Sequence, residues 1–207
     1  MIKEIPTAGI ILAAGESKRF GRPKQLLRLE DRYLIEWVLD AAINSKLSSV
    51  VLVLGHAHDK ILQALDQKLQ HTEIHIEINP EFKKGQSTSL RAGLSKVKDH
   101  FAAAMFLLAD QPMLNPTIIN TLLDSFWRSD KNICVPIYRG QRKNPTLFDQ
   151  RFYKQLMGIR GDIGARELID ENPHNVLFVE IDNPLYFSDI DTQQDVENLK
   201  NQLNKIT

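Results

Sequence analysis

Short apolar runs alternate with amphipathic stretches along the 207 residues of the chain. Several runs are rich in Val, Ile and Leu and lack polar alternation, which is typical of strands covered by helices on both faces. These runs predict strands at Gly9–Ala14, Val50–Leu54, Glu73–Ile78, Ala102–Ala109, Ile133–Pro136 and Val176–Glu180. The amphipathic stretches predict helices at Tyr33–Asn44, Asp59–Gln70, Ser87–Lys98, Pro116–Trp127, Phe148–Met157, Gly164–Asp170 and Gln193–Leu203.

This alternation predicts an α/β fold with a mainly parallel sheet and right-handed crossovers. The length suits one domain, and no linker in the sequence is long enough to require a second. The segment 138–145, YRGQRKNP, is the most loop-like insertion, and the strand pattern weakens after it. We therefore expect a single domain, residues 1–207, whose first half ends near residue 136.

Composition argues against several classes of protein. A hydrophobic content of 43% and a charged content of 25% are those of a soluble globular protein. Because 26 basic residues balance 26 acidic ones, no overall charge favours a nucleic acid or a membrane as a partner. The single cysteine, Cys134, excludes an internal disulfide and fits a reducing compartment. With no signal-peptide core at MIKEIPTAGI and no membrane-spanning run, a cytoplasmic protein is expected.

The stretch from Gly9 to Lys24, GIILAAGESKRFGRPK, indicates where an anion binds. Its apolar run ends at Gly15, and five cations follow between Lys18 and Arg28. Glycine lets backbone N–H groups approach phosphate oxygens closely, and cations neutralise the phosphate charge. The spacing fits neither a Walker A loop nor a dinucleotide-binding fingerprint. An ordinary turn with solvated basic residues is the alternative, but cations crowded after a buried strand favour the anion site.

The segment LAAGESKRFGRPKQLL resembles the signature loop LAAGxSxRxGxxK of nucleotidyltransferases that transfer NMP from an NTP to a phosphorylated acceptor. It is similar above all to the molybdenum cofactor cytidylyltransferase branch of the MobA-like NTP transferases. The resemblance implies a Rossmann-like, three-layer α/β/α fold of the glycosyltransferase-A type, with a mainly parallel sheet and Mg²⁺-dependent chemistry. It also implies that Arg19 and Lys24 act in catalysis by offsetting the charge on pyrophosphate. The implied nucleotide contacts of the loop are Leu12, Ala13, Ala14, Gly15, Ser17, Arg19 and Lys24.

A second motif, FLLADQPML, places Asp110 directly after the apolar run Ala102–Ala109. Ligands of open α/β sheets bind at the carboxyl ends of strands, where a carboxylate suits Mg²⁺ held jointly with phosphates. Taken alone, an aspartate that starts a turn before Pro112 is the better interpretation. The resembled family has a metal-binding aspartate in Gly-Asp-Gln-Pro here, which implies that Asp110 is catalytic and binds both metal and nucleotide. Ala109 replaces the family's glycine and adds only a methyl group.

The segment SDIDTQQD adds two aspartates just before the last predicted helix. Asp189 and Asp191 alternate along an extended segment and are expected to point to the same side. Capping of the helix by Asp191 and Thr192 is a sound alternative interpretation. The match to the family's Asp-x-Asp-Thr-Pro implies that one of the two completes the metal site with Asp110. Asp191 is preferred because it is nearer the start of the helix.

The segment KKGQSTSLRAGL, residues 83–94, is the candidate base reader. Around the first turn of an amphipathic helix, free N–H groups and hydroxyls can contact a base or a sugar. Simple capping of the helix by Ser87 or Thr88 is the alternative. The resembled family recognises the nucleobase at this place, which favours nucleotide-binding roles for Gly85, Gln86, Ser87 and Ser89.

The resemblance continues in RKNPTLF and GIRGDIGAR. These segments match the family's Gly-Asn-Pro and Gly-Asp-x-Gly-Ala-Arg stretches beside the acceptor site, with Lys143 in place of the first glycine. Without the resemblance, GDIG is a turn with a helix cap and Arg166 a surface residue. With it, acceptor-binding roles are implied for Asn144, Pro145, Gly161, Asp162 and Arg166.

Together with the resemblance, the sequence predicts an enzyme that transfers CMP from CTP to the terminal phosphate of molybdopterin, or of its molybdenum form, and releases pyrophosphate. Residues 1–136 are predicted to be the NTP-binding half and residues 137–207 the acceptor-binding and lid half. A transient contact with a molybdoenzyme is also expected. The alternatives are GTP or a sugar or polyol phosphate as substrate, and a non-catalytic protein that delivers the pterin cofactor. The loop form LAAG, against LAGG in the guanylyl branch, favours CTP.

Overall fold

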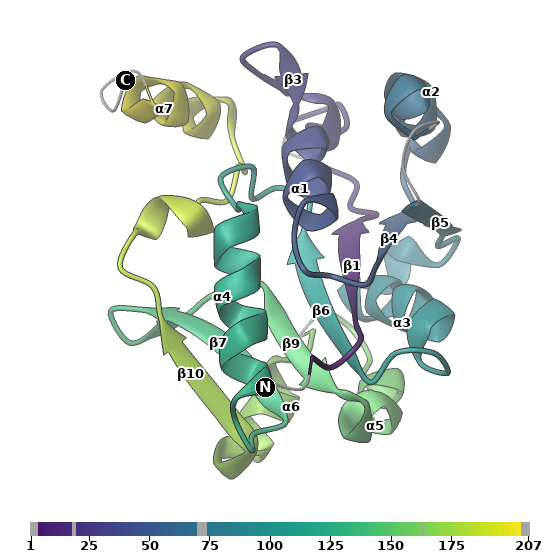
Figure 1. The fold of residues 1–207 in the computed structure, drawn as a ribbon. Coiled ribbons are helices and arrows are strands. Elements are labelled where there is room, and N and C mark those ends of the chain that lie inside the picture. Colours follow the sequence, from purple (N-terminus) through teal and green to yellow (C-terminus); the bar gives the residue numbers. More distant parts are fainter. Residues whose placement is uncertain (1–3, 18–19, 70–73, 163, 204–207) are drawn as a thin grey trace.

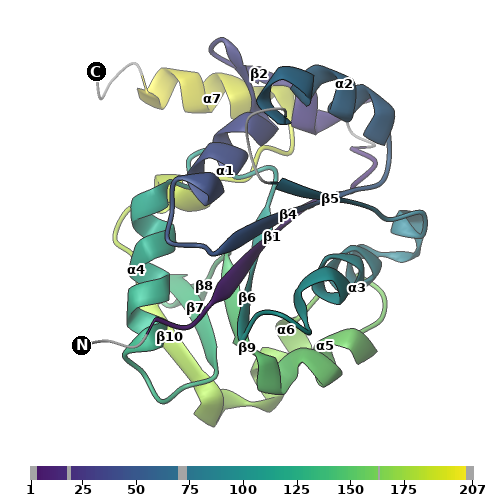
Figure 2. The same ribbon diagram turned by 45° about the vertical axis from the view of Figure 1, so that its right-hand side comes forward.

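The computed structural model describes residues 4–17, 20–69, 74–162 and 164–203. Its centre is an eight-stranded mixed sheet in the order β10-β7-β9-β6-β1-β4-β5 (Figure 1), with β8 paired to β7 (Figure 2). The strands of this sheet are β1 Thr7–Ala13, β4 Ser49–Leu54, β5 Ile74–Ile78, β6 Ala103–Leu108, β7 Ile133–Tyr138, β8 Gln141–Arg142, β9 Thr146–Asp149 and β10 Val176–Glu180. A separate hairpin is formed by β2 Arg28–Leu29 and β3 Arg32–Tyr33.

Helices cover both faces of the sheet. The helices are α1 Leu34–Ile43, α2 His58–Leu69, α3 Gln86–Val97, α4 Pro116–Trp127, α5 Tyr153–Gly158, α6 Arg166–Glu171 and α7 Gln193–Leu203. Helix α7 does not cover the sheet but packs in a separate cluster with Leu29 and Leu34. Helices α1, α2 and α4 pack on one face, and α3, α5 and α6 on the other (Figures 1 and 2). Successive residues of a strand point to opposite faces, so Ile11 packs with the first group and the adjacent Ile10 with the second.

The strand pairing confirms the predicted α/β class. The neighbours β6, β1, β4 and β5 are parallel, as are β7 and β10, whereas β8 and β9 run antiparallel to their partners. Strands from both predicted halves of the chain belong to this one sheet. The division near residue 136 into an NTP-binding and an acceptor-binding half therefore stays a prediction. Within the described residues, no helix is long and apolar enough to cross a membrane.

The prediction of one helix over Phe148–Met157 is wrong at its start. Residues 146–149 form β9, which lies antiparallel between β7 and β6 and joins the β7–β10 pair to the rest of the sheet. A 3-10 turn, η3 (Gln150–Phe152), follows, and α5 begins only after it. Phe148 is fully buried, with its ring 6.1 Å from that of Phe106 and 6.4 Å from that of Phe152. Packing thus selects the strand, because four residues are too few for periodicity to distinguish a strand from a helix.

The middle of the sheet contains a point where the strand order reverses. From β1, the chain continues to β4 and β5 on one side, whereas β6 pairs on the other side. Leu12 of β1 pairs with Leu108 of β6, so the loop after β1 emerges beside Asp110. Ligands of open α/β sheets bind at such switch points, at the carboxyl ends of the strands. The predicted place of Asp110, after a central strand, is confirmed.

Candidate functional site

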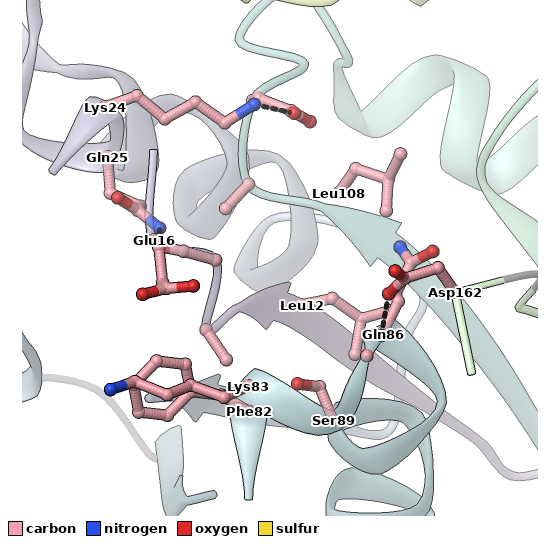
Figure 3. Close-up of a pocket in the computed structure, with 15 residues that line it drawn as sticks. Leu12, Glu16, Lys24, Gln25, Phe82, Lys83, Gln86, Ser89, Leu108 and Asp162 are labelled. Carbon is pink, nitrogen blue, oxygen red and sulfur yellow. Dashed lines mark hydrogen bonds and ion pairs between the residues drawn. The ribbon is translucent and has the colours of Figure 1, made fainter. Parts of the chain in front are cut away.

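A cavity of about 380 Å³ opens at the carboxyl ends of β1 and β6 (Figure 3). Its walls are the end of β1 with its loop, the 3-10 turn η1 (Lys24–Leu26), and the end of β6. The start of α3, the preceding turn η2 (Phe82–Lys84) and one residue ahead of α6 complete it. The lining residues are Leu12, Ala14, Gly15, Glu16, Lys24, Gln25, Phe82, Lys83, Gly85, Gln86, Ser89, Leu108, Ala109, Asp110 and Asp162.

The structure brings most of the predicted nucleotide contacts to this cavity. Eight of them line it, namely Leu12, Ala14, Gly15, Lys24, Gly85, Gln86, Ser89 and Asp110. Ala13, Ser17 and Ser87 are not part of the lining, and Arg19 lies outside the described residues. Sequence reasoning gave no role to Glu16, Gln25, Phe82 and Lys83, although all but Phe82 lie within the quoted motif segments.

The loop after β1 is held in place by the segment that follows it. Gln25 is 2% exposed, and its Nε2 donates a hydrogen bond of 2.8 Å to the carbonyl oxygen of Ala13. Ser17 has a φ of 52°, and its Oγ accepts a bond of 3.0 Å from the backbone N–H of Lys24. These contacts fold η1 against the loop. Ser17 thus holds the backbone of Lys24, and this contact helps to direct the Lys24 side chain toward the end of β6.

Lys24 lies between two carboxylates from distant parts of the chain. Its Nζ is 2.5 Å from Asp110 Oδ2 and 3.1 Å from Asp191 Oδ1 (the first contact is dashed in Figure 3). Burial of the ammonium lowers its pKa, but the charges and hydrogen bonds of Asp110 and Asp191 outweigh burial. The pKa of Lys24 is therefore raised above its ordinary value, and the side chain is a permanent cation beside the cavity.

Asp191 reaches this place because the segment around it is docked on the turn that follows β6. The backbone N–H of Ile190 donates a 3.0 Å bond to the carbonyl oxygen of Asp110. Gln111 donates from Nε2 to Asp189 Oδ1 at 2.9 Å. Burial, then the nearby charge of Asp110, raises the pKa of Asp189. Asp191 thus faces Lys24 while Asp189 is engaged by Gln111, and the preference for Asp191 as the metal ligand stays a prediction.

The donor set at this point suits a hard cation that is also bound by phosphates. Asp110 Oδ1 is buried and has no hydrogen-bond partner among the described residues. The described residues contain no group of three His, Cys, Asp or Glu side chains that could hold a metal ion. Mg²⁺ commonly takes one or two carboxylates and completes its shell with water and substrate phosphates. Asp110 and Asp191 supply two such carboxylates, but the ammonium of Lys24 lies between them in this structure and would have to move aside for both to hold one metal ion.

The start of α3 forms the opposite wall of the cavity. Ser89 is anchored by Asn79, whose Nδ2 donates at 3.0 Å to Ser89 Oγ and at 2.8 Å to Thr88 Oγ1. Ser87 is fully buried, its Oγ lacks a hydrogen-bond partner among the described residues, and it is not part of the cavity lining. Its predicted role as a nucleotide contact therefore has no support from the lining. Gln86 does face the cavity.

A second cavity of about 300 Å³ adjoins the first. The two share Leu12, Gln86 and Leu108, and the second is lined further by Leu90, Phe106, Val135, Arg142, Lys143, Asn144, Thr146, Gly164, Ala165, Arg166 and Ile169. Three cationic side chains at its edge make it suitable for an anionic ligand, although Arg142 also pairs with Asp170. Of the predicted acceptor contacts, this cavity includes Asn144 and Arg166. Asp162 lines the first cavity instead, and Pro145 and Gly161 line neither.

Comparison with known proteins identifies relatives over most of the chain. Residues 9–176 match the family described as the MobA-like NTP transferase domain. A probable molybdenum cofactor guanylyltransferase of Halalkalibacterium halodurans is 30% identical over 142 residues, 67% of either chain. The nicotine blue oxidoreductase of Paenarthrobacter nicotinovorans is 28% identical over 202 residues, 92% of this chain and 95% of that protein. The bifunctional protein GlmU of Sorangium cellulosum is 26% identical over 187 residues, but this chain spans only 38% of its length.

Solved structures confirm the fold. A homologue of Rv0371c from Mycobacterium sp. strain JC1 has a TM-score of 0.83 and 26% identity, covering 97% of this chain and 98% of its own. A manganese complex of Rv0371c from Mycobacterium tuberculosis has a TM-score of 0.77 at 26% identity, with coverage of 95% and 98%. A nucleotidyl transferase from Methanothermobacter, 17% identical with a TM-score of 0.81, shares the fold. The predicted Rossmann-like nucleotidyltransferase architecture is therefore confirmed.

Proposed function

The chain belongs to the MobA-like NTP transferase family, and from this premise we propose that it transfers CMP from CTP to the terminal phosphate of a molybdopterin-type acceptor. The observation that carries the proposal is the position of Lys24, paired with Asp110 and Asp191 where the loop after β1 meets the end of β6. A cation and two carboxylates beside a nucleotide-sized cavity are the groups that phosphoryl transfer requires.

In the proposed reaction, the nucleotide occupies the first cavity and the acceptor the second. The shared residues Leu12, Gln86 and Leu108 mark where the two substrates meet. The acceptor phosphate attacks the α-phosphorus of CTP, the bond from the α-phosphorus to the bridging oxygen breaks, and pyrophosphate leaves. No covalent enzyme intermediate is needed, because holding both substrates in line supplies much of the rate gain.

Lys24 has the clearest role among the residues of this chain. Its raised pKa keeps the ammonium charged, so it can stabilise the negative charge that develops on the leaving pyrophosphate. Arg19, which lies outside the described residues, is proposed to act beside it. Asp110 and Asp191 would hold Mg²⁺, and the buried, unpaired Oδ1 of Asp110 supports that role. When bound, the metal would neutralise phosphate oxygens and make the α-phosphorus more electrophilic.

The choice of CTP rests on the loop and on the wall opposite it. Ala14 lines the cavity at the position where the guanylyl form of the loop has a glycine, and this difference favours CTP in the proposal. Gln86, which also lines the cavity, offers both a donor and an acceptor to the edge of a base. GTP is the second candidate, because five relatives, including that of Halalkalibacterium halodurans, are named probable molybdenum cofactor guanylyltransferases.

An assay of pyrophosphate release tests the proposal. The protein is incubated with purified molybdopterin, Mg²⁺ and each of the four NTPs in turn. We expect release with CTP, dependent on both the acceptor and the metal. Release with GTP alone would contradict the cytidylyl assignment, and release with CTP only when a sugar phosphate replaces molybdopterin would contradict the acceptor. No release with any combination, together with tight binding of molybdopterin, would favour a delivery protein.

A further inference from the structure

Helix α3 is tied to the segment that precedes α6. Among the residues that the structure describes, three hydrogen bonds cross between them, all donated by α3. They run from Arg91 Nη1 to Ile159 O (2.7 Å), from Ser87 N to Gly161 O (3.1 Å) and from Gln86 N to Asp162 Oδ1 (3.0 Å). The last of these satisfies a backbone N–H group in the first turn of α3, where no partner is available within the helix.

The contact is too close for any side chain at Gly85. A Cβ built there would lie 2.7 Å from the carbonyl carbon and oxygen of Gly161 and 2.8 Å from Asp162 Oδ1. Gly85 also has a φ of 108°, a backbone conformation that residues with a Cβ rarely adopt. The first turn of α3 and the Gly161–Asp162 backbone therefore form one tightly fitted unit.

This unit lies between the two cavities. Gln86 lines both of them, and Asp162 lines the first. Two residues further along the chain, Gly164 lies close enough for a Cβ to be 3.4 Å from Gln86 Oε1. Ala165 and Arg166 come next and line the second cavity. A shift of the first turn of α3 would thus act, through Asp162, on the backbone that carries Arg166.

We propose that Asp162 is a positioning residue that couples the two cavities. Its carboxylate holds the start of α3 in register with the segment that leads to Arg166, so occupation of one cavity orders the wall of the other. This role differs from the direct acceptor contact that the sequence predicts for Asp162. The inference rests on the proposed function, because it takes the first cavity as the nucleotide site and the second as the acceptor site.

The test compares Asp162→Ala, which removes the accepting oxygen, with Asp162→Asn, which keeps it. Asp149→Ala is the matched control, because Asp149 Oδ1 likewise accepts a backbone bond, from Arg151 N at 2.9 Å, but lines neither cavity. Amide hydrogen exchange is measured by mass spectrometry for each full-length protein, with and without Mg²⁺ and CTP. Peptides that cover residues 12–25, 82–89 and 159–166 are followed.

In the wild-type protein and in Asp149→Ala, we expect the nucleotide to slow exchange in all three peptides. In Asp162→Ala, residues 12–25 keep their protection against exchange. The protection factor of residues 159–166 falls about fivefold, which is the loss expected for one helix-capping contact. Asp162→Asn restores most of that protection. In the pyrophosphate assay, Asp162→Ala raises KM for molybdopterin by a similar factor, whereas Asp149→Ala leaves it unchanged.

Two results would overturn the coupling while leaving the proposed function intact. One is protection of 12–25 without protection of 159–166 in the wild-type protein. The other is equal protection of 159–166 in the wild-type protein and in Asp162→Ala. If neither CTP nor any of the other three NTPs protects residues 12–25 from exchange, the assignment of the first cavity as a nucleotide site is contradicted. The coupling is then contradicted with it.

Discussion

At the scale of single residues, the proposed chemistry depends most on Lys24. Its ammonium is paired with Asp110 and Asp191 beside the cavity, where charge develops on pyrophosphate in the proposed reaction. We predict that Lys24→Ala lowers kcat by about 10²- to 10³-fold, the usual cost of losing one charge-stabilising group. The Kd for CTP rises by less than about tenfold, because the charge matters more as pyrophosphate leaves than in the bound substrate.

Steady-state kinetics and calorimetric titration with CTP separate the two effects. Lys98→Ala serves as the control, since Lys98 pairs with Asp99 on the surface and lines neither nucleotide nor acceptor cavity. An unchanged kcat combined with much weaker CTP binding would reverse the role given to Lys24, making it a contact for general phosphate affinity.

Asp110 provides a second test at the same scale. Asp110→Asn keeps the shape of the side chain and removes its charge, and with it a ligand suited to Mg²⁺. We predict a loss of at least about a hundredfold in kcat, and a requirement for more Mg²⁺ to reach half of the remaining rate. Asp99→Asn, at an exposed ion pair, is the control. Near-normal rates with a normal dependence on Mg²⁺ would refute the metal role.

At the scale of elements, α3 depends on a close approach to the sheet. A Cβ at Gly93 would lie 2.3 Å from Ile10 Cγ2 and 2.8 Å from Val53 Cγ2. We predict that Gly93→Ala lowers the free energy of unfolding by about 1–3 kcal/mol, because overpacking exceeds the gain in helix propensity. Gly158→Ala is the matched control, since its Cβ would meet nothing within 4 Å.

Urea unfolding of both variants measures this difference. For Gly158→Ala we expect the free energy of unfolding to change by no more than about 0.5 kcal/mol. If the two variants were equally stable, the close packing of α3 against β1 and β4 would not be a requirement of the fold.

The hydrophobic pattern alone is sufficient to predict the strands that are covered by helices on both faces. The strands around β1 are continuous apolar runs, because helices bury both of their faces. It was insufficient for β9, which has only four residues and owes its place to pairing with β6 and β7 far away in the sequence. Small hairpins such as β2–β3 were missed for the same reason, since two residues per strand carry no period.

The site shows a similar limit. Resemblance of local motifs is enough to predict that Lys24 and Asp110 lie at the cavity, because both are in recognisable loops after strands. Gln25 and Asn79 could not be found this way, because their roles consist of hydrogen bonds to backbone or hydroxyl groups that only the fold brings near. Asp162 was found, but the sequence did not reveal that it contacts the first turn of α3.

At the scale of the whole molecule, Cys134 reports on global opening. It lies on β7, is 1% exposed, and burial raises the pKa of its thiol to about 12. Well below that pH the thiol stays protonated, and the thiolate is the reactive form. We predict negligible reaction of the native protein with a disulfide reagent near about pH 8, and complete reaction of one thiol in concentrated urea. Rapid labelling of the native protein would contradict the buried position of Cys134.

The most direct test of the central claim follows the phosphorus atoms of the nucleotide. The protein is incubated with molybdopterin, Mg²⁺ and CTP that is labelled at either the α- or the γ-phosphate. The account predicts that the α-label becomes bound to the pterin acceptor, and that the γ-label appears in pyrophosphate in equal amount. Label from the γ-phosphate on the acceptor, or as orthophosphate alone, would contradict nucleotidyl transfer at this site.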